Sequence, residues 1–142
     1  MQSHGFWPQI IQEKIIHEVE RECLNLVRQD CSNINYYSNI HEKVENVNEL
    51  INEDVRKKVK KLLGSIEIEL MATELHVQYP YCANIPHHQD NFYHCTQYNK
   101  SLKVLVPLNK LEVTNGGLIF LDTNKNYPVQ KHEPSSVNNF SS

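Results

Sequence analysis

The chain has 142 residues, of which 39% are hydrophobic and 22% charged, and its formal net charge is −3. This length is typical of a single domain that can bury a core, and the composition argues against disorder. The small negative charge gives no electrostatic reason to expect a nucleic acid or an anionic membrane as partner. The first residues lack a secretory pattern and no apolar run reaches the length of a membrane span, so we expect a cytoplasmic protein.

Cysteine spacing excludes two common kinds of site. The four cysteines are Cys23, Cys31, Cys82 and Cys95, and none of them forms a C-x-x-C pair. Neither a zinc knuckle nor a redox dithiol is therefore indicated, and reduced thiols are expected.

Two amphipathic helices are predicted in the first 64 residues. Between Gln9 and Arg28, apolar residues recur every four positions, as on one face of a helix: Ile11, Ile15, Val19, Cys23 and Val27. A second helix is predicted to begin at Asn52, a good N-cap, and to stop near Gly64. Residues 29–51 are rich in Asn, Ser and Tyr, and predict a loop with one short helix.

The basic run from Arg56 to Lys61 lies on this second predicted helix. It is compatible with an anion site, but a solvated helix face favoured by the C-terminal helix dipole explains it without a ligand. We favour the solvated face.

After Gly64 the apolar period falls to two residues, which indicates strands. Residues 66–70 and 73–79 alternate in this way, and in the second run Glu74, His76 and Gln78 share the polar face. Two further apolar runs, 102–108 and 118–121, predict strands joined by a link with an Asn115-Gly116 turn. The predicted fold class is α+β, a single domain with a helical segment at 1–64 and an antiparallel sheet at 65–142.

His88 and Asp90 are the candidate metal ligands. On an extended strand, residues two apart project to the same face, so an imidazole nitrogen and a carboxylate would reach one spot. These are two of the three ligands of the 2-His-1-carboxylate triad that holds non-haem Fe(II). The spacing alone is a weak signal, because it occurs by chance in roughly one in five chains of this composition.

The surroundings of the motif add specificity. His-Gln-Asp at 88–90 is followed by the apolar run 102–108, a polar connection, the Asn115-Gly116 turn and the apolar run 118–121. This order, over about residues 73 to 132, resembles the phytanoyl-CoA dioxygenase family of Fe(II)- and 2-oxoglutarate-dependent oxygenases. The resemblance implies a double-stranded β-helix (a jelly-roll, cupin-like sheet), Fe(II), 2-oxoglutarate as cosubstrate, O₂, and a small-molecule or acyl-type substrate.

The resemblance also implies a set of site residues. His88 and Asp90 would bind the metal, and Gln89 would place its backbone near the site. Leu105 falls on the strand where some relatives place an aromatic residue beside 2-oxoglutarate, and Leu75 on a strand that lines the cosubstrate from another side. The polar face of residues 73–79 is an alternative to Leu75 for lining the cosubstrate, since a shift of one residue in register exchanges the two faces of the strand.

Three other histidines near the motif have simpler interpretations. His87 falls on the opposite face of the strand from His88, which favours a surface or supporting position. His94 is a candidate neighbour of the pocket. His76 fits a satisfied sheet histidine as well as it fits a cosubstrate contact.

The chain departs from the family pattern after the turn. Relatives have a Pro-Gly-Ser-His-Lys-like segment where this chain has Asn124, and no arginine follows Arg56 to pair with the far carboxylate of 2-oxoglutarate. His132 has no strand leading into it and is not expected to be the third ligand. Residues 65–142 supply four or five predicted strands against about eight in a closed β-helix. We therefore expect a partial domain, from a longer chain or a natural truncation, that binds iron weakly and is inactive alone.

Three classes of function remain open. The leading one is a fragment of an Fe(II)- and 2-oxoglutarate-dependent oxygenase. A non-catalytic cupin-like binding module would keep the sheet without the chemistry. A zinc hydrolase using His and Asp ranks last, because a further His or Cys at motif spacing is missing.

Overall fold

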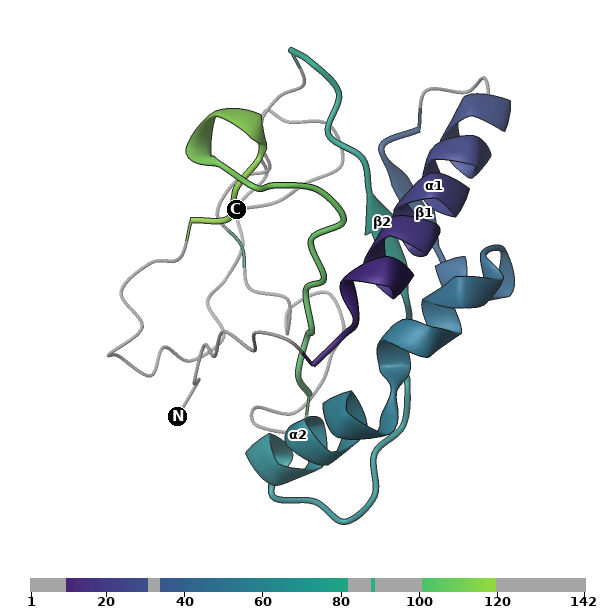
Figure 1. The fold of residues 1–142 in the computed structure, drawn as a ribbon. Coiled ribbons are helices and arrows are strands. Elements are labelled where there is room, and N and C mark those ends of the chain that lie inside the picture. The colour runs from purple at the N-terminus through teal and green to yellow at the C-terminus, as the bar shows by residue number, and fades with distance from the viewer. Residues whose placement is uncertain (1–9, 31–33, 82–87, 89–100, 120–142) are drawn as a thin grey trace.

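The computed structural model describes residues 10–30, 34–81, 88 and 101–119. The fold is α+β, as predicted, with two α-helices, short 3₁₀ helices and a two-stranded antiparallel sheet within the described residues (Figure 1). In chain order the elements are α1 (Glu13–Gln29), β1 (Tyr36–Ser38), η1 (Ile40–Glu42), η2 (Glu45–Ile51), α2 (Glu53–Leu63), β2 (Glu74–His76) and η3 (Val113–Asn115). Within these ranges, neither α-helix combines the length and the apolar character needed to cross a bilayer.

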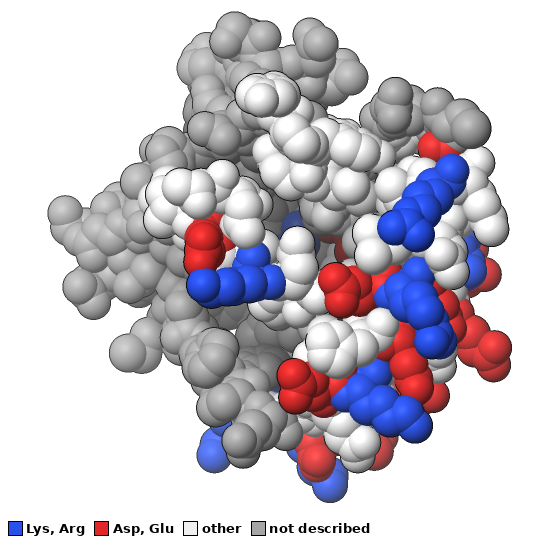
Figure 2. Space-filling view, turned by 45° about the horizontal axis from the view of Figure 1, so that its top comes forward, with Lys and Arg blue, Asp and Glu red and all other residues white. Residues whose placement is uncertain are grey.

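Helix α1 forms over most of the predicted stretch, but it begins at Glu13, so Ile11 lies before the helix and not on its face. Val19 and Cys23 are its buried residues, and Val19 is only 1% exposed. The outer face carries charges of both signs, interspersed in Figure 2, with Lys14 Nζ 3.7 Å from Glu18 Oε1. Burial raises the pKa of the Cys23 thiol to about 11, so this cysteine is a protonated core side chain rather than a reactive thiolate.

Helix α2 begins and ends at the two predicted signals. The Asn52 side-chain oxygen accepts a hydrogen bond from the Val55 N–H at 3.0 Å, which satisfies a free donor of the first turn. Gly64 has a φ of 61°, and its N–H donates to the carbonyl oxygens of Lys60 and Lys61. A left-handed residue that closes the last turn in this way is most often glycine.

The segment predicted as a loop contributes four of the six buried residues of the core cluster, which corrects the prediction. Residues 29–51 contain β1, η1 and η2, and four of their side chains are buried: Tyr37, Ile40, Val44 and Val47. These four pack with Val19 and Cys23 of α1 in one cluster. Their spacing of three, four and three residues is a helix-like apolar period that the polar residues around them obscure.

Strand β2 is shorter than the predicted strand over residues 73–79, but its alternation is as expected. It pairs antiparallel with β1, and Tyr37 lies opposite Leu75 on the core side. The pairing continues for one hydrogen bond beyond β2, from the Val77 N–H to the Asn35 carbonyl oxygen at 2.9 Å. Glu74 and His76 consequently project from the other face of the sheet.

Two of the predicted strands are absent from the described residues. Residues 66–70 belong to no strand, and Ile66 is 89% exposed. Residues 102–108 belong to none either, although Leu108 packs against the core cluster and the segment runs beside β2 in Figure 1. An alternating or apolar pattern marks a segment suited to a sheet, but a strand also needs a partner for its backbone groups. The predicted strand at 118–121 extends outside the described residues, and 118–119 are not in a strand.

The predicted turn at Asn115-Gly116 forms, with a different geometry. Residues 113–115 make the 3₁₀ helix η3, and the Glu112 N–H donates to the Asn115 side-chain oxygen at 2.6 Å. Gly116 follows with a φ of 95°, in the left-handed region. The predicted turn is therefore the end of a 3₁₀ helix, and no strand flanks it within the described residues.

Candidate functional site

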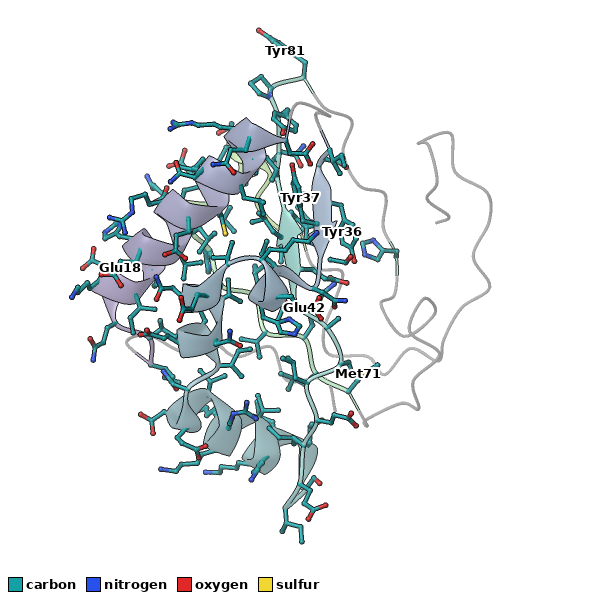
Figure 3. The ribbon with its side chains drawn as sticks, turned by 90° about the vertical axis from the view of Figure 1, so that its right-hand side faces the viewer. Glu18, Tyr36, Tyr37, Glu42, Met71 and Tyr81 are labelled. Carbon is teal, nitrogen blue, oxygen red and sulfur yellow. The ribbon has the colours of Figure 1, made fainter. Side chains whose placement is uncertain are left out.

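Four side chains meet on the face of the sheet that points away from the core. The Tyr36 hydroxyl donates to Glu74 Oε1 at 2.9 Å, and Lys103 Nζ lies 3.1 Å from Glu74 Oε2. His76 Nε2 is 3.5 Å from the same Oε2 atom. The Tyr36 and His76 rings meet edge to face, with centroids 5.2 Å apart. We call these four residues the Glu74 cluster; Figure 3 shows Tyr36 on its strand.

Strand register accounts for the cluster. Tyr36 in β1 lies directly opposite His76 in β2, and Ser38 lies opposite Glu74. These four strand residues therefore occupy one face of the sheet, while Tyr37 is buried on the other. Lys103 reaches the same face from the segment beside β2. The Glu74 side chain is only 14% exposed, which makes its interaction with Lys103 stronger than a pair in open solvent.

The cluster shifts the ionisation of both acidic groups. Desolvation raises the pKa of the Glu74 carboxyl, but hydrogen bonds from Tyr36 and Lys103 outweigh it and hold the pKa below its ordinary value. Partial burial, followed by the hydrogen bond and negative charge of Glu74, raises the pKa of Tyr36 to about 12. Near neutral pH the cluster therefore contains a carboxylate at Glu74 and a neutral phenol at Tyr36.

We expect Tyr36 to ionise near pH 12 instead of its ordinary 10.0. Because the folded state favours the neutral phenol, the stability this group contributes is complete below pH 10.0 and is lost as pH rises through about 12. An ultraviolet titration of the unchanged chain minus that of Tyr36→Phe measures this pKa directly. Glu74→Gln should lower it, and a difference spectrum with a midpoint of 10 in the unchanged chain would contradict the assignment.

The polar face continues along the chain to Gln78. A side chain at position 116 would place its Cβ atom 3.1 Å from the Gln78 Cγ atom, which is closer than most Cβ atoms in proteins lie to a neighbouring atom. Gly116 thus allows the turn after η3 to approach Gln78 closely. The segment 101–119 meets this polar face at two points, Lys103 and Gly116.

The structure places the predicted site residues only in part. His88 is exposed, while Gln89 and Asp90 lie outside the described residues. Leu75 packs against the core cluster, on the opposite side of the sheet from Glu74, and Leu105 is 54% exposed. Within the described residues, no group of three or more His, Cys, Asp or Glu side chains is arranged to hold a metal ion.

The family model described as phytanoyl-CoA dioxygenase (PhyH) matches residues 9–138, which is most of the chain. The chain belongs to the phytanoyl-CoA dioxygenase family. No curated protein and no solved structure matches it. The match includes both helices as well as the His88-Gln89-Asp90 motif, so it extends well before the segment that carries the motif resemblance.

Membership of the phytanoyl-CoA dioxygenase family sets the general chemistry. The family generally consists of Fe(II)- and 2-oxoglutarate-dependent dioxygenases, which use O₂ and a small-molecule substrate, and it implies a cupin-like fold. The donor set of this chain fits Fe(II), because imidazole nitrogen and carboxylate oxygen are the ligand types of the non-haem iron triad. His88 and Asp90 are predicted to supply one of each.

None of the four members of the Glu74 cluster was among the predicted metal or cosubstrate residues. The polar face that carries Glu74 and His76 was an alternative to Leu75, whereas Tyr36 and Lys103 were not considered. Lys103 had a signal in the sequence, since it is the only charged residue in the apolar run 102–108. A lone charge in such a run indicates a specific partner. Tyr36 had no local signal, because its partner Glu74 is 38 residues away and only the sheet brings them together.

Proposed function

We propose that this chain carries part of the active site of an Fe(II)- and 2-oxoglutarate-dependent dioxygenase that hydroxylates a small-molecule or acyl-type substrate. The observation that carries the proposal is the family match over residues 9–138, with the His88-x-Asp90 motif inside it. In this proposal residues 1–142 form one partial domain, in which a helical segment at 1–64 precedes the first half of a double-stranded β-helix at 65–142.

His88 and Asp90 would hold Fe(II), His88 through a neutral imidazole nitrogen and Asp90 through a carboxylate oxygen. Gln89, through its backbone, and Leu105, as an apolar wall, would lie beside the cosubstrate. Leu75 would line it from the neighbouring strand, where its side chain packs against the core cluster and the polar face of residues 73–79 competes for the same role. When bound, Fe(II) would supply the activation of O₂, of which one oxygen atom enters succinate as 2-oxoglutarate loses CO₂ and the other enters a substrate C–H bond as a hydroxyl group. The tasks of the protein are to bind, to orient the C–H bond and to exclude water.

The proposal is tested by an anaerobic Fe(II) titration of the chain with and without 2-oxoglutarate. We expect 2-oxoglutarate to tighten Fe(II) binding by about fivefold or more, because a cosubstrate that chelates the metal couples the two binding equilibria. A parallel titration with Zn(II) measures how much of the increase in metal affinity also occurs with a metal other than iron. Fe(II) binding that is indifferent to 2-oxoglutarate would overturn the proposal and favour the non-catalytic binding module.

A further inference from the structure

Helix α2 presents positive charge to solvent. Lys57, Lys58 and Lys61 are exposed, and the helical period places them on the side that faces away from the buried Val55. We call these three lysines the basic face of α2. The Lys57 Nζ atom lies 3.8 Å from Asp54 Oδ1, but both side chains are 73% exposed. An exposed pair of this kind is weak, so the Lys57 ammonium group remains available to another anion.

Exposed aliphatic side chains lie beside the basic face. Leu62 is 39% exposed in the last turn of α2, and Ile66, two residues after Gly64 ends the helix, is 89% exposed. The Ser65 hydroxyl donates to the Glu67 carbonyl oxygen at 2.6 Å and accepts from the Glu67 N–H at 3.3 Å. Ile66 therefore lies at the tip of a turn held by two hydrogen bonds. Figure 1 shows α2 and this turn together at the lower end of the described part of the chain.

The charge of this stretch is opposite in sign to that of the whole chain. Residues 56–71 contain five basic and two acidic residues, which gives a formal charge of +3 against −3 for the chain. The two acidic residues, Glu67 and Glu69, lower the local charge without reversing it. The basic run by itself needs only solvent, but a basic helix face beside exposed aliphatic residues is typical of a surface that binds the membrane interface.

We propose that the basic face of α2, together with Leu62 and Ile66, binds the surface of an anionic phospholipid bilayer. The three ammonium groups contact anionic headgroups, and Ile66 enters the boundary between the headgroups and the acyl chains. Such a peripheral contact requires no membrane-spanning helix. The inference does not rest on the proposed iron chemistry, because none of these residues belongs to the proposed iron site.

The residue types favour a lipid surface over a nucleic acid as the partner. Proteins that bind single strands stack the bases on aromatic rings and arginine, and residues 56–71 include no aromatic residue. The one arginine of the stretch, Arg56, donates through Nε to the Ile51 carbonyl oxygen at 3.2 Å, which ties its side chain to the end of η2. Burial of Ile66 is favourable in an apolar environment, which a bilayer provides and a phosphate backbone does not.

The test is co-sedimentation of the full chain with vesicles of phosphatidylcholine alone and with vesicles in which about a third of the lipid is phosphatidylserine. One test variant carries Lys57→Gln, Lys58→Gln and Lys61→Gln together and is called the α2 variant. The other is Ile66→Ser, which removes an exposed aliphatic side chain and should leave the fold intact. Circular dichroism verifies the folding of each variant.

Helix α1 supplies a matched control for each change. The α1 variant removes the same number of positive charges from exposed side chains: Lys14→Gln, Arg21→Gln and Arg28→Gln. Leu24→Ser removes an aliphatic side chain that is 45% exposed on that helix. A general effect of net charge or of exposed apolar surface would appear in both helices.

We expect the unchanged chain to bind the phosphatidylserine vesicles about tenfold or more tightly than the phosphatidylcholine vesicles. The α2 variant should bind them about 100-fold more weakly, at about fivefold per lysine, and the α1 variant should stay within about threefold of the unchanged chain. Ile66→Ser should weaken binding by about five- to tenfold, and Leu24→Ser should leave it unchanged. If the α2 variant does not fold, Lys57→Gln with Lys61→Gln carries the same comparison, with a loss of about 25-fold expected.

A chain that binds both kinds of vesicle equally, or neither, would overturn the inference. Equal losses in the α2 and α1 variants would also overturn it, because they indicate a general effect of net charge. If Ile66→Ser binds as tightly as the unchanged chain, the surface recognises charge alone and the bilayer is not its partner; binding of a DNA duplex or of polyglutamate, measured on the same variants, then identifies the class of polyanion. None of these outcomes affects the proposed function.

Discussion

Substituting His88 by alanine is expected to weaken Fe(II) binding by about 100-fold or more. The reason is that the chain offers two proposed ligands, and the loss of one leaves a single carboxylate that any exposed aspartate could match. Changes to residues that merely support a ligand already cost about 10- to 100-fold in metal affinity, so removing the ligand itself should cost at least as much. Anaerobic calorimetry in the presence of 2-oxoglutarate measures the effect.

His87 supplies the matched control for this substitution. It is adjacent in sequence and chemically identical, but it is predicted to project to the other face of the strand. His87→Ala should therefore leave Fe(II) affinity within about threefold of the unchanged chain, while Asp90→Ala should repeat the loss seen in His88→Ala. Equal losses in His87→Ala and His88→Ala would show that the assumed strand register is wrong.

Val19→Ala is expected to lower the free energy of unfolding by about 2 kcal/mol, the cost of deleting buried methyl groups and leaving a cavity. Val19 is 1% exposed and packs in the cluster that joins α1 to β1, η1 and η2. Leu24→Ala on the same helix, where Leu24 is 45% exposed, should cost about 0.5 kcal/mol or less. Urea denaturation measures both, and equal losses would contradict the assignment of this core.

The helices were predictable because their signals are local. The four-residue recurrence through Val19 and Cys23 requires only one face of a helix to be buried, and the structure buries that face. Asn52 and Gly64 act within one turn of their own positions, through hydrogen bonds to Val55 and to the carbonyl groups of the last turn. Such signals do not depend on any distant part of the chain.

The sheet was less predictable because each strand depends on a distant partner. Tyr37 in β1 pairs with Leu75 in β2, and the intervening residues contain two 3₁₀ helices and α2. A three-residue strand such as β1 carries too short a pattern to be recognised. Conversely, Ile66 belongs to a clear alternating pattern and is nevertheless exposed, since no described strand pairs with its segment.

The candidate site also has one part that the sequence predicts from a local pattern and one part that depends on contacts between distant segments. His88 and Asp90 were predicted from their spacing within three consecutive residues and from the family resemblance, and they stay a prediction. The Glu74 cluster depends on the pairing of β1 with β2 and on the approach of Lys103, so sequence reasoning found its polar face but neither Tyr36 nor Lys103. Contacts between segments far apart in the sequence have no local period that would reveal them.

In the proposed iron site, the side chains of His88 and Asp90 bind the same Fe(II) ion. Nuclear magnetic resonance of the histidine-labelled chain tests this shared binding, with the His88 ring signals identified by their loss in His88→Gln. On anaerobic addition of Fe(II) and 2-oxoglutarate, we predict a large paramagnetic shift of the His88 ring signals, and Asp90→Ala should abolish it. If the His88 signals keep their positions while Fe(II) binds, or shift equally without Asp90, the two residues do not form the iron site.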